Sequence, residues 1–435
     1  MTALTGPFLV NASTGSDTAA SGVGPSTAVS FTGLIDASGA PTQVTTMGST
    51  TGITAGHVLF AQTSTGIQFN VVASISTAFG TTTITCDSDW GENFNSTVVC
   101  GGKRASITNM VEVFNTTNGF ECDVELETDV NWDATTTSGN PSFIRKIYSS
   151  ESGTRRTITS DQQYQIKGGQ WYFVDLTFHC DSSTYDSRLF RSESSTGNAK
   201  CVAENCIFGD VDNVKNYNYI NNGVSSVSAF LNPLRIYARG CLFAHFKTAL
   251  GGFLSPSLYN CHIRDIPRLN YGQLNGSPYN APLLGSVIGC LITNVDRLDS
   301  STDGRSARWF GNIIDDLNGT NPSSFGEEAL VYSSSQKCSD FHNNILTNCT
   351  FVGSYVEGRG NIFYNTSDGV GEFEQTITLS SDPFKDESSG DFDFTASQQA
   401  LFEMDFGSDK VKAYGFNHAG GGGFTKVGLN GGIDG

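Results

Sequence analysis

Charged residues are scarce in this chain. They make up 16% of its 435 residues, against roughly 25% in an average soluble domain. Basic residues are the scarcer kind, with 25 Lys and Arg against 43 Asp and Glu, which gives a formal net charge of −18 at pH 7. Binding to nucleic acid or to anionic lipid depends on clustered cations. The composition therefore predicts neither nucleic acid nor a membrane as a partner.

Long hydrophobic runs and metal-binding motifs are also missing. No stretch approaches the roughly 18 consecutive apolar residues of a membrane span, and residues 1–18 lack the pattern of a secretory signal. The eleven cysteines form no Cys-x-x-Cys pair. No zinc motif, nucleophile elbow or phosphate-binding loop occurs, so the sequence predicts no metal and no cofactor. We expect the thiols to be reduced and buried.

Glycine and phenylalanine are plentiful, with 49 and 30 residues respectively. Together with many Ser, Thr and Asn residues, they favour β-strands joined by many turns. In the first part of the chain, short apolar runs stand at residues 8–10, 57–62, 67–75 and 81–86. Their spacing predicts a small antiparallel β domain over residues 1–105, ending near the segment Cys100–Arg104.

The middle of the chain contains an internal repeat. Its eight copies are VDLTFHC, ENCIFGD, RGCLFAH, YNCHIRD, IGCLITN, FGNIIDD, NNILTN and RGNIFYN, with anchor residues Phe178, Phe208, Phe243, Ile263, Ile292, Ile314, Leu346 and Phe363. The anchors are 17 to 35 residues apart. A rigid helical repeat does not tolerate such variation, whereas a coil of short parallel strands lets extra residues leave as loops. The pattern therefore predicts stacked parallel strands, with a β-sandwich as the alternative.

Positions flanking the anchors repeat as well. Two residues before the anchor stand Leu176, Cys206, Cys241, Cys261, Cys290, Asn312, Asn344 and Asn361. This column shares a strand face with the anchors, so we expect both to point inward and to stack about 4.8 Å apart. Two residues after the anchor stand Cys180, Asp210, His245, Asp265, Asn294, Asp316, Asn348 and Asn365. This outer turn column suits a bend, because Asn and Asp tolerate the left-handed backbone.

On these columns the chain resembles the pectate-lyase-like superfamily over about residues 170–390. The closing phrase SDPFKDESSGDFDFTASQQAL at 381–401 is similar to the last segment of such proteins. Stretches 13–33 and 98–109 resemble virion-associated β-helix proteins of tailed bacteriophages. The resemblance implies an all-β chain, namely a right-handed parallel β-helix over 106–394 preceded by the N-terminal β domain. Residues 395–435 would be a C-terminal cap, with a short helix at 395–404, and a glycine-rich tail.

Candidate catalytic residues come from the outer turn column. Asp210, His245 and Asp265 belong to consecutive repeats, so an imidazole would stand between two carboxylates and could bind a cation or a sugar. The alternative is a ladder of polar turn residues that support the backbone, and this is the interpretation we favour. For pectate-lyase-like chemistry, Asp210 and Asp212 would hold calcium and Arg239 would abstract a proton.

A pair of carboxylates is the other possibility for glycoside hydrolysis. Asp315 and Asp316 are adjacent, and consecutive strand residues face opposite ways, so one of them would need a partner from a neighbouring coil. Galacturonase-type relatives carry NTD, DD, GHG and RIK signatures. Only the DD is present in this sequence, which argues against that activity.

Two functions follow as hypotheses. The first is a non-catalytic structural protein located in the virion, as capsid decoration or in a fibre or spike. It would form a homotrimer, by resemblance to spikes, and contact other virion proteins. The second is a depolymerase, a lyase or glycosidase acting on a host-surface glycan, which exposed aromatic side chains on a lateral face would favour. The aromatic residues available are Trp171, Tyr172, Tyr217, Tyr219 and Trp309.

Overall fold

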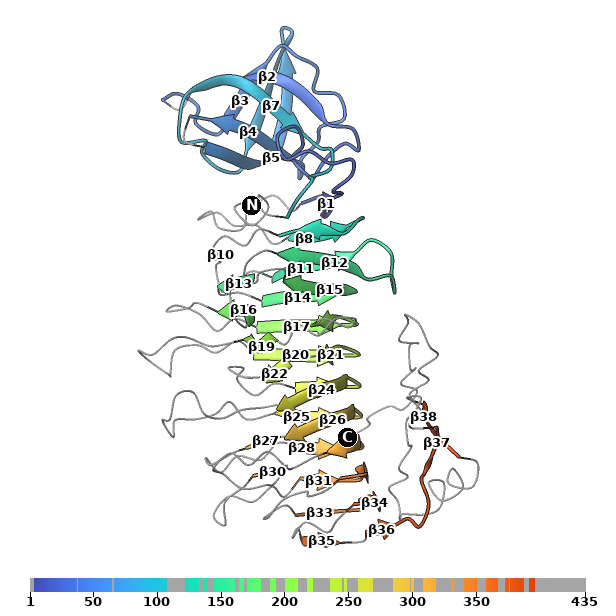
Figure 1. The fold of residues 1–435 in the computed structure, drawn as a ribbon. Helices are drawn as coiled ribbons and strands as arrows, with labels where there is room; N and C mark the ends of the chain where they lie inside the picture. The colour runs from blue at the N-terminus through green and yellow to red at the C-terminus, as the bar shows by residue number, and fades with distance from the viewer. Residues whose placement is uncertain are drawn as a thin grey trace, which may run out of the picture. The chain divides into compact units, whose positions relative to one another are not determined.

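The computed structural model is all-β, with no helix among the residues it describes (Figure 1). These are residues 4–36, 38–64, 66–107, 122–132, 137–138, 144–160, 164–167, 170–180, 188–192, 200–209, 217–221, 235–244, 246–248, 257–268, 285–297, 299–300, 308–317, 330–331, 340–349, 357–366, 372–374, 376–386 and 391–395. Within these ranges no helix is long and apolar enough to cross a membrane. The chain divides into two compact units, residues 1–185 with 190–202, and residues 186–189 with 203–435.

The first unit contains a closed antiparallel barrel with the strand order β2-β3-β6-β5-β4-β7. Its strands are β2 (Val29–Ile35), β3 (Gln43–Thr46), β4 (Val58–Thr63), β5 (Gly66–Ala78), β6 (Thr81–Cys86) and β7 (Phe94–Cys100). The predicted strands at 57–62, 67–75 and 81–86 are confirmed as β4, β5 and β6. Side chains alternate between inward and outward along β2, β3 and β6, which is the strand period of two.

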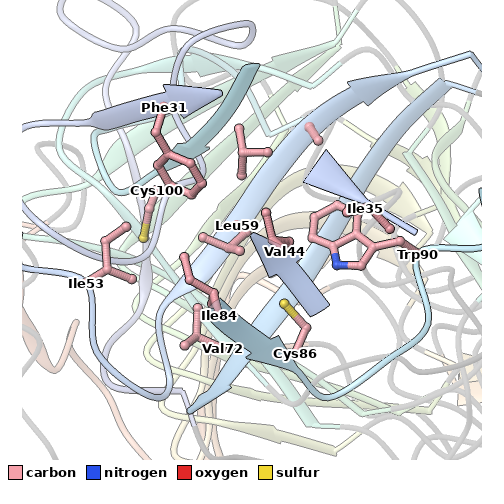
Figure 2. Packing of buried hydrophobic residues seen from close by; sticks show 12 residues of the cluster. Phe31, Ile35, Val44, Ile53, Leu59, Val72, Ile84, Cys86, Trp90 and Cys100 are labelled. Carbon is pink, nitrogen blue, oxygen red and sulfur yellow. The ribbon is translucent and has the colours of Figure 1, made fainter. Parts of the chain in front are cut away.

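The barrel encloses an apolar core (Figure 2). Twelve buried residues form it: Phe31, Ile35, Val44, Ile53, Leu59, Ala61, Val72, Ile84, Cys86, Trp90, Val98 and Cys100. The Trp90 ring packs edge-on against Phe94, with 5.4 Å between the ring centroids. Closing the barrel leaves none of its strands with an unpaired edge.

The segment at residues 8–10 is a correction to the sequence analysis. It forms β1 (Phe8–Val10), which pairs in parallel with β8 (Cys122–Leu126) rather than joining the antiparallel barrel. Phe8 and Val10 are fully buried there, so the strand covers the first parallel layer of this unit. The other parallel strands of the unit are β9 (Val130–Asn131), β10 (Thr137–Ser138), β11 (Ile144–Ser149), β12 (Arg156–Ser160), β13 (Tyr164–Lys167), β14 (Gln170–Val174) and β15 (Leu176–Cys180).

Arg104 fastens the barrel to these parallel strands. Its side chain is fully buried, and Nη1 donates a hydrogen bond to the Ala20 carbonyl at 2.8 Å. Its guanidinium lies 5.3 Å from the Phe60 ring centroid and 5.4 Å from that of Phe69, both in the barrel. Its backbone pairs with Val10 of β1. One buried cation, neutralised in part by Asp17 at 3.3 Å, therefore holds both parts together.

The second unit consists of parallel strands stacked in a solenoid-like manner (Figure 1). One sheet contains β20 (Arg235–Arg239), β23 (Ser257–Tyr259), β25 (Ser286–Ile288), β28 (Arg308–Phe310) and β31 (Phe341–His342). The other contains β18 (Ile207–Phe208), β21 (Leu242–Ala244), β24 (His262–Arg268), β26 (Leu291–Arg297), β29 (Ile313–Leu317), β32 (Ile345–Thr347), β34 (Ile362–Tyr364) and β36 (Ile377–Thr378). We call one passage of the chain through both sheets a coil.

The structure also contains shorter parallel strand pairs. They are β19 (Tyr217–Asn221) paired with β22 (Phe246–Thr248), β27 (Asp299–Ser300) with β30 (Leu330–Val331), and β33 (Glu357–Arg359) with β35 (Glu372–Glu374). Strands β16 (Arg188–Ser192) and β17 (Lys200–Glu204) stand at the division between the units. Residues 396–435, with the predicted short helix and glycine-rich tail, lie outside the described residues.

The anchor column is confirmed residue by residue in this unit. Parallel pairing aligns Phe208, Phe243, Ile263, Ile292, Ile314, Leu346 and Phe363 in one register. The first six side chains are fully buried. The rings of Phe208 and Phe243 stack with their centroids 5.1 Å apart and an interplanar angle of 12°. The variable loops between repeats therefore leave the register of the core unchanged.

The residues two positions before the anchors, which we call the Cys/Asn column, are also buried as predicted. The Asn312 Nδ2 donates to the Asn344 Oδ1 at 2.8 Å, and the Asn344 Nδ2 donates to the Asn361 Oδ1 at 3.2 Å. Each amide also donates to a carbonyl of the preceding coil, for example Asn344 to Trp309 at 3.2 Å. Cys290 makes the equivalent contact through its Sγ, 3.6 Å from the Leu258 carbonyl. Thiols and amides thus satisfy equivalent backbone carbonyls in successive coils.

The thiols of Cys241, Cys261 and Cys290 are buried and form no disulfide. Loss of hydration on burial raises the pKa of Cys241 and Cys261 well above its usual value. Both thiols therefore stay protonated in the native protein, where they act as small apolar side chains with a weak donor.

The residue immediately before each member of the Cys/Asn column also has a left-handed backbone, which was not expected from the sequence. The residues are Asn205, Gly240, Asn260, Gly289, Gly311, Asn343 and Gly360, with φ between 50° and 69°. Glycine adopts this conformation readily, and asparagine and aspartate adopt it more easily than other side chains do. The signal was in the sequence, because seven of the eight repeats have Asn or Gly at this place and the first has Asp175, which is left-handed as well.

An apolar column on the outside of the β18–β36 sheet is covered by the end of the chain. Leu291, Ile313, Ile345 and Ile362 face away from the anchors, yet all four are buried. They pack against Phe384 of β37 (Phe384–Asp386) and Phe392 of β38 (Asp391–Phe394), which form an antiparallel hairpin. The closing segment inferred from the DP turn and the D-F-D-F strand is therefore a cover for a second apolar surface.

The Asn ladder predicts a specific cost of mutation. Replacing Asn344 by Leu removes hydrogen bonds with Asn312, Asn361 and the Trp309 carbonyl, so the free energy of unfolding should fall by about 1–3 kcal/mol. Chemical denaturation measures the change. Asn344→Cys is the control, since a thiol occupies this position in the preceding coils and should restore part of the loss. Equal losses for the two variants would contradict the hydrogen-bond explanation.

Candidate functional site

The predicted group Asp210, His245 and Asp265 is described only in part. Asp210 and His245 lie outside the described residues, as does Asp212. Asp265 stands within β24 with a φ of 55°. Its carboxylate accepts a hydrogen bond from the Asn294 Nδ2 at 2.8 Å and lies 3.9 Å from the Arg264 Nε. A catalytic role for the three residues therefore stays a prediction.

The outer turn column has the backbone that the sequence predicts for a bend. Asp265, Asn294, Asp316, Asn348 and Asn365 all have φ between 45° and 55°. Neighbouring side chains bond along the column, since the Asn365 Nδ2 donates to the Asn348 Oδ1 at 2.8 Å. At these five positions the backbone makes the predicted turn, and side-chain bonds join neighbouring coils; Cys180, the first member of the column, instead ends strand β15 and does not have a positive φ.

Asp315 is the buried carboxylate of this region. One of its oxygens accepts hydrogen bonds from the Thr347 Oγ1 at 2.8 Å and from the Asn348 Nδ2 at 3.0 Å. Strand pairing places Thr293 and Thr347 beside it, in the coils before and after. The register therefore gives Asp315 threonine neighbours instead of the second carboxylate that glycoside hydrolysis would need at this position.

His262 is a polar residue that the sequence analysis did not single out. It is buried in β24, and its Nε2 lies 3.5 Å from the Thr293 Oγ1. Its register position is occupied by Leu242 and Leu291 in the coils on either side. A polar residue within an otherwise apolar column was the signal that could have identified it. His262, Thr293, Asp315, Thr347 and Asn348 together form what we call the outer polar cluster.

The chemistry available to the outer polar cluster is limited by these bonds. Among the described residues no group of three or more His, Cys, Asp or Glu side chains is arranged to hold a metal ion. The Asp315 oxygen that accepts from two side chains of the following coil is engaged in holding that coil. The arrangement therefore suits a structural carboxylate better than a general acid or base, which needs a free path to its substrate.

Replacing Asp315 by Ala should lower the free energy of unfolding by about 1–3 kcal/mol, because Thr347 and Asn348 lose a buried acceptor. Thermal and chemical denaturation measure the change. Asp315→Asn keeps one acceptor oxygen and should recover part of the loss. An Ala variant as stable as the wild type would show that the carboxylate is not structural.

The comparisons with known proteins do not place the chain in a family. No family model matches it, and no curated protein matches it. One similar solved chain is described as a glycoside hydrolase, with a TM-score of 0.28, 9% sequence identity, and coverage of 85% of this chain and 77% of that chain. A TM-score this low carries no argument about the fold or the activity of this chain.

Proposed function

We propose that the chain is a right-handed parallel β-helix of the pectate-lyase-like kind. We further propose that it serves as a non-catalytic structural component of a bacteriophage particle. The handedness rests on the general rule that crossovers between parallel strands of one sheet are right-handed in about 98% of cases. The capsid surface, a fibre and a spike are all compatible with this role, with three copies and contacts to other virion proteins.

The observation that best supports a structural role is that polar side chains hydrogen-bond neighbouring coils to one another. In the second unit, Asp265, Asp315 and Asn348 are each hydrogen-bonded to a residue of a neighbouring coil. Buried amides continue the same bonding inside the coils. Carboxylate groups, which act as acids and bases in many enzymes, here hydrogen-bond one coil to the next. A solenoid whose neighbouring coils are joined in this way suits a component that must endure outside a cell.

Purified phage particles should contain the wild-type chain, detectable by quantitative mass spectrometry and by immunogold electron microscopy. The triple variant Asp210→Ala, His245→Ala, Asp265→Ala should be incorporated equally well. The wild-type protein should release no reducing ends from host polysaccharide, because its turn column supports backbone. Release by the wild type that disappears in the triple variant would establish a depolymerase instead.

Recognition of a glycan is the second candidate, and a specific observation favours it. Three exposed large hydrophobic side chains, Tyr237, Tyr259 and Phe310, lie on the outer face of the β20–β31 sheet. Register aligns one column of this face as Arg239, Tyr259, Ile288, Phe310 and His342. We call this column the aromatic stripe. None of the aromatic residues named from the sequence is in it, and Trp309 instead points inward and is fully buried.

The aromatic stripe has dimensions that suit an extended glycan. Tyr259 and Phe310 are two coils apart, which is roughly 10 Å at the usual strand separation and comparable to a disaccharide unit of an extended chain. Aromatic faces carry negative charge density that attracts the C–H groups of a sugar ring. Arg239 is exposed at one end of the stripe and can pair with a carboxylate.

The double variant Tyr259→Ala, Phe310→Ala should lower affinity for fluorescent hyaluronan oligosaccharides at least tenfold, measured by fluorescence anisotropy. Dextran, which has no charge, should bind more weakly to the wild type. Phe79→Ala removes a more fully exposed aromatic residue, which lies in the barrel, and is the control. Identical affinities of the wild type and the double variant would remove the support that the stripe gives to glycan recognition.

A further inference from the structure

The barrel exposes apolar side chains at the turn between β5 and β6. Phe79 is fully exposed there, and Met47 and Leu34 are the other exposed large hydrophobic residues among those described in the first unit. A single exposed apolar residue is ordinary on a protein surface. Several at one place on an otherwise polar barrel indicate a contact site.

Phe79 is held outward at a cost to the backbone. Ala78 pairs with Thr81, so Phe79 and Gly80 form a two-residue turn, with φ of 53° and 79°. Asn-Gly is the favoured sequence for such a turn, because both residues must adopt positive φ. A bulky aromatic residue in the left-handed region costs on the order of 1–3 kcal/mol. Folding alone gives no reason for phenylalanine at this position.

Met47 directly follows the end of β3, whose last residue is paired close to the same turn. Thr46, the last residue of β3, pairs with Thr82, which stands two residues after the turn residue Gly80, and Met47 is the next residue of the chain. Leu34 of β2 pairs with Thr45, which precedes Met47 by two residues in the chain. We call Met47, Phe79 and Gly80 the apolar tip. The unbranched Met side chain adapts its shape to a partner, while the Phe ring offers a rigid anchor.

The charges of the barrel restrict what can cover the apolar tip. Residues 1–102 contain no Lys and no Arg, so the barrel has no cations with which to bind anionic lipid or nucleic acid. The chain has a formal charge of −18 and its barrel has no Lys or Arg to pair with acidic groups of another copy, which disfavours contact between the barrels of two copies. Threonines line the strands next to the tip, at positions 32, 45, 81 and 83. An apolar pocket in a different protein is the complement to such a surface.

The tip also stands on a rigid base. Strand pairs hold β5 and β6 together from the turn down to Cys86. Arg104 joins the barrel to the parallel strands of the same unit. An anchor presented in this way loses little conformational freedom on binding.

From these observations we propose that the apolar tip inserts into an apolar pocket of another protein of the particle and attaches the chain there. This rests on the proposed structural role and names the surface that performs it. The Phe79 ring fills the pocket, and Met47 closes over its edge.

The test uses particles assembled with full-length variants, and counts copies per particle by quantitative mass spectrometry. Phe79→Asn should reduce the copy number at least tenfold. Asn tolerates positive φ, so the same variant should be at least as stable as the wild type in thermal denaturation, which separates lost attachment from misfolding. Met47→Thr should reduce incorporation to a smaller extent. Tyr259→Ala with Phe310→Ala, which removes exposed aromatic residues elsewhere, should be incorporated like the wild type.

Each other outcome overturns a distinct statement. Absence of the wild type from particles would refute the structural role itself. Normal incorporation of both the wild type and Phe79→Asn would refute the attachment site alone. Oligomers of the purified wild type that dissociate in Phe79→Asn, seen by sedimentation velocity, would make a second copy the occupant. Binding of the wild type but not Phe79→Asn to phosphatidylcholine vesicles would make it a lipid surface.

Discussion

The corner between the two sheets of the second unit is the constraint on which its fold depends. The chain must turn there within two residues while its peptide groups are buried. A left-handed residue makes the bend, and the next side chain, Cys or Asn, points inward and donates to a carbonyl of the preceding coil, as Asn312 does to Val287 at 2.9 Å. Backbone bonds cross the same corner, for example from the Leu291 amide to the Cys261 carbonyl at 2.9 Å. An unpaired buried peptide group is costly, so each corner must lie directly on the one before it. This requirement keeps the anchors in register however long the intervening loops are.

The same constraint explains which features could be predicted from sequence. Anchors and inward polar residues repeat because each coil needs them, and their register was confirmed through to Phe363. The position of β1 could not be predicted, because three apolar residues fit a parallel or an antiparallel strand equally well. The buried outer column at Ile313 and Ile345 left a readable signal that was missed. Adjacent apolar residues in a repeat break the alternation of a half-buried strand and indicate burial on both faces. Arg104 left no signal, since its burial depends on rings from distant strands.

The candidate site was less predictable for a physical reason. A column of Asp, Asn and His at a turn looks the same in the sequence whether its side chains bond the backbone, a neighbouring coil or a substrate. Asp315 shows how the distinction is made, because two donors from the following coil occupy one of its oxygens. Those donors are 32 and 33 residues away in sequence, and their approach depends on stacking that no local pattern specifies. The chemistry of such a carboxylate is therefore fixed by the register of the coils, which only the folded structure reveals.

Burial of apolar surface follows two different rules in this chain. The outer column of the second unit would be exposed by the coils alone, and the hairpin carrying Phe384 and Phe392 covers it. The hairpin thus removes this apolar surface from water, which stabilises the fold by about 25 cal/mol for each Å² buried. Phe79 shows the opposite, since a turn that would be more stable with asparagine instead holds a large ring in solvent. The chain covers one apolar surface and exposes another at a cost in backbone strain, as expected if the exposed surface contacts a partner. Exposure at Phe79 is therefore better explained by a partner than by incomplete packing.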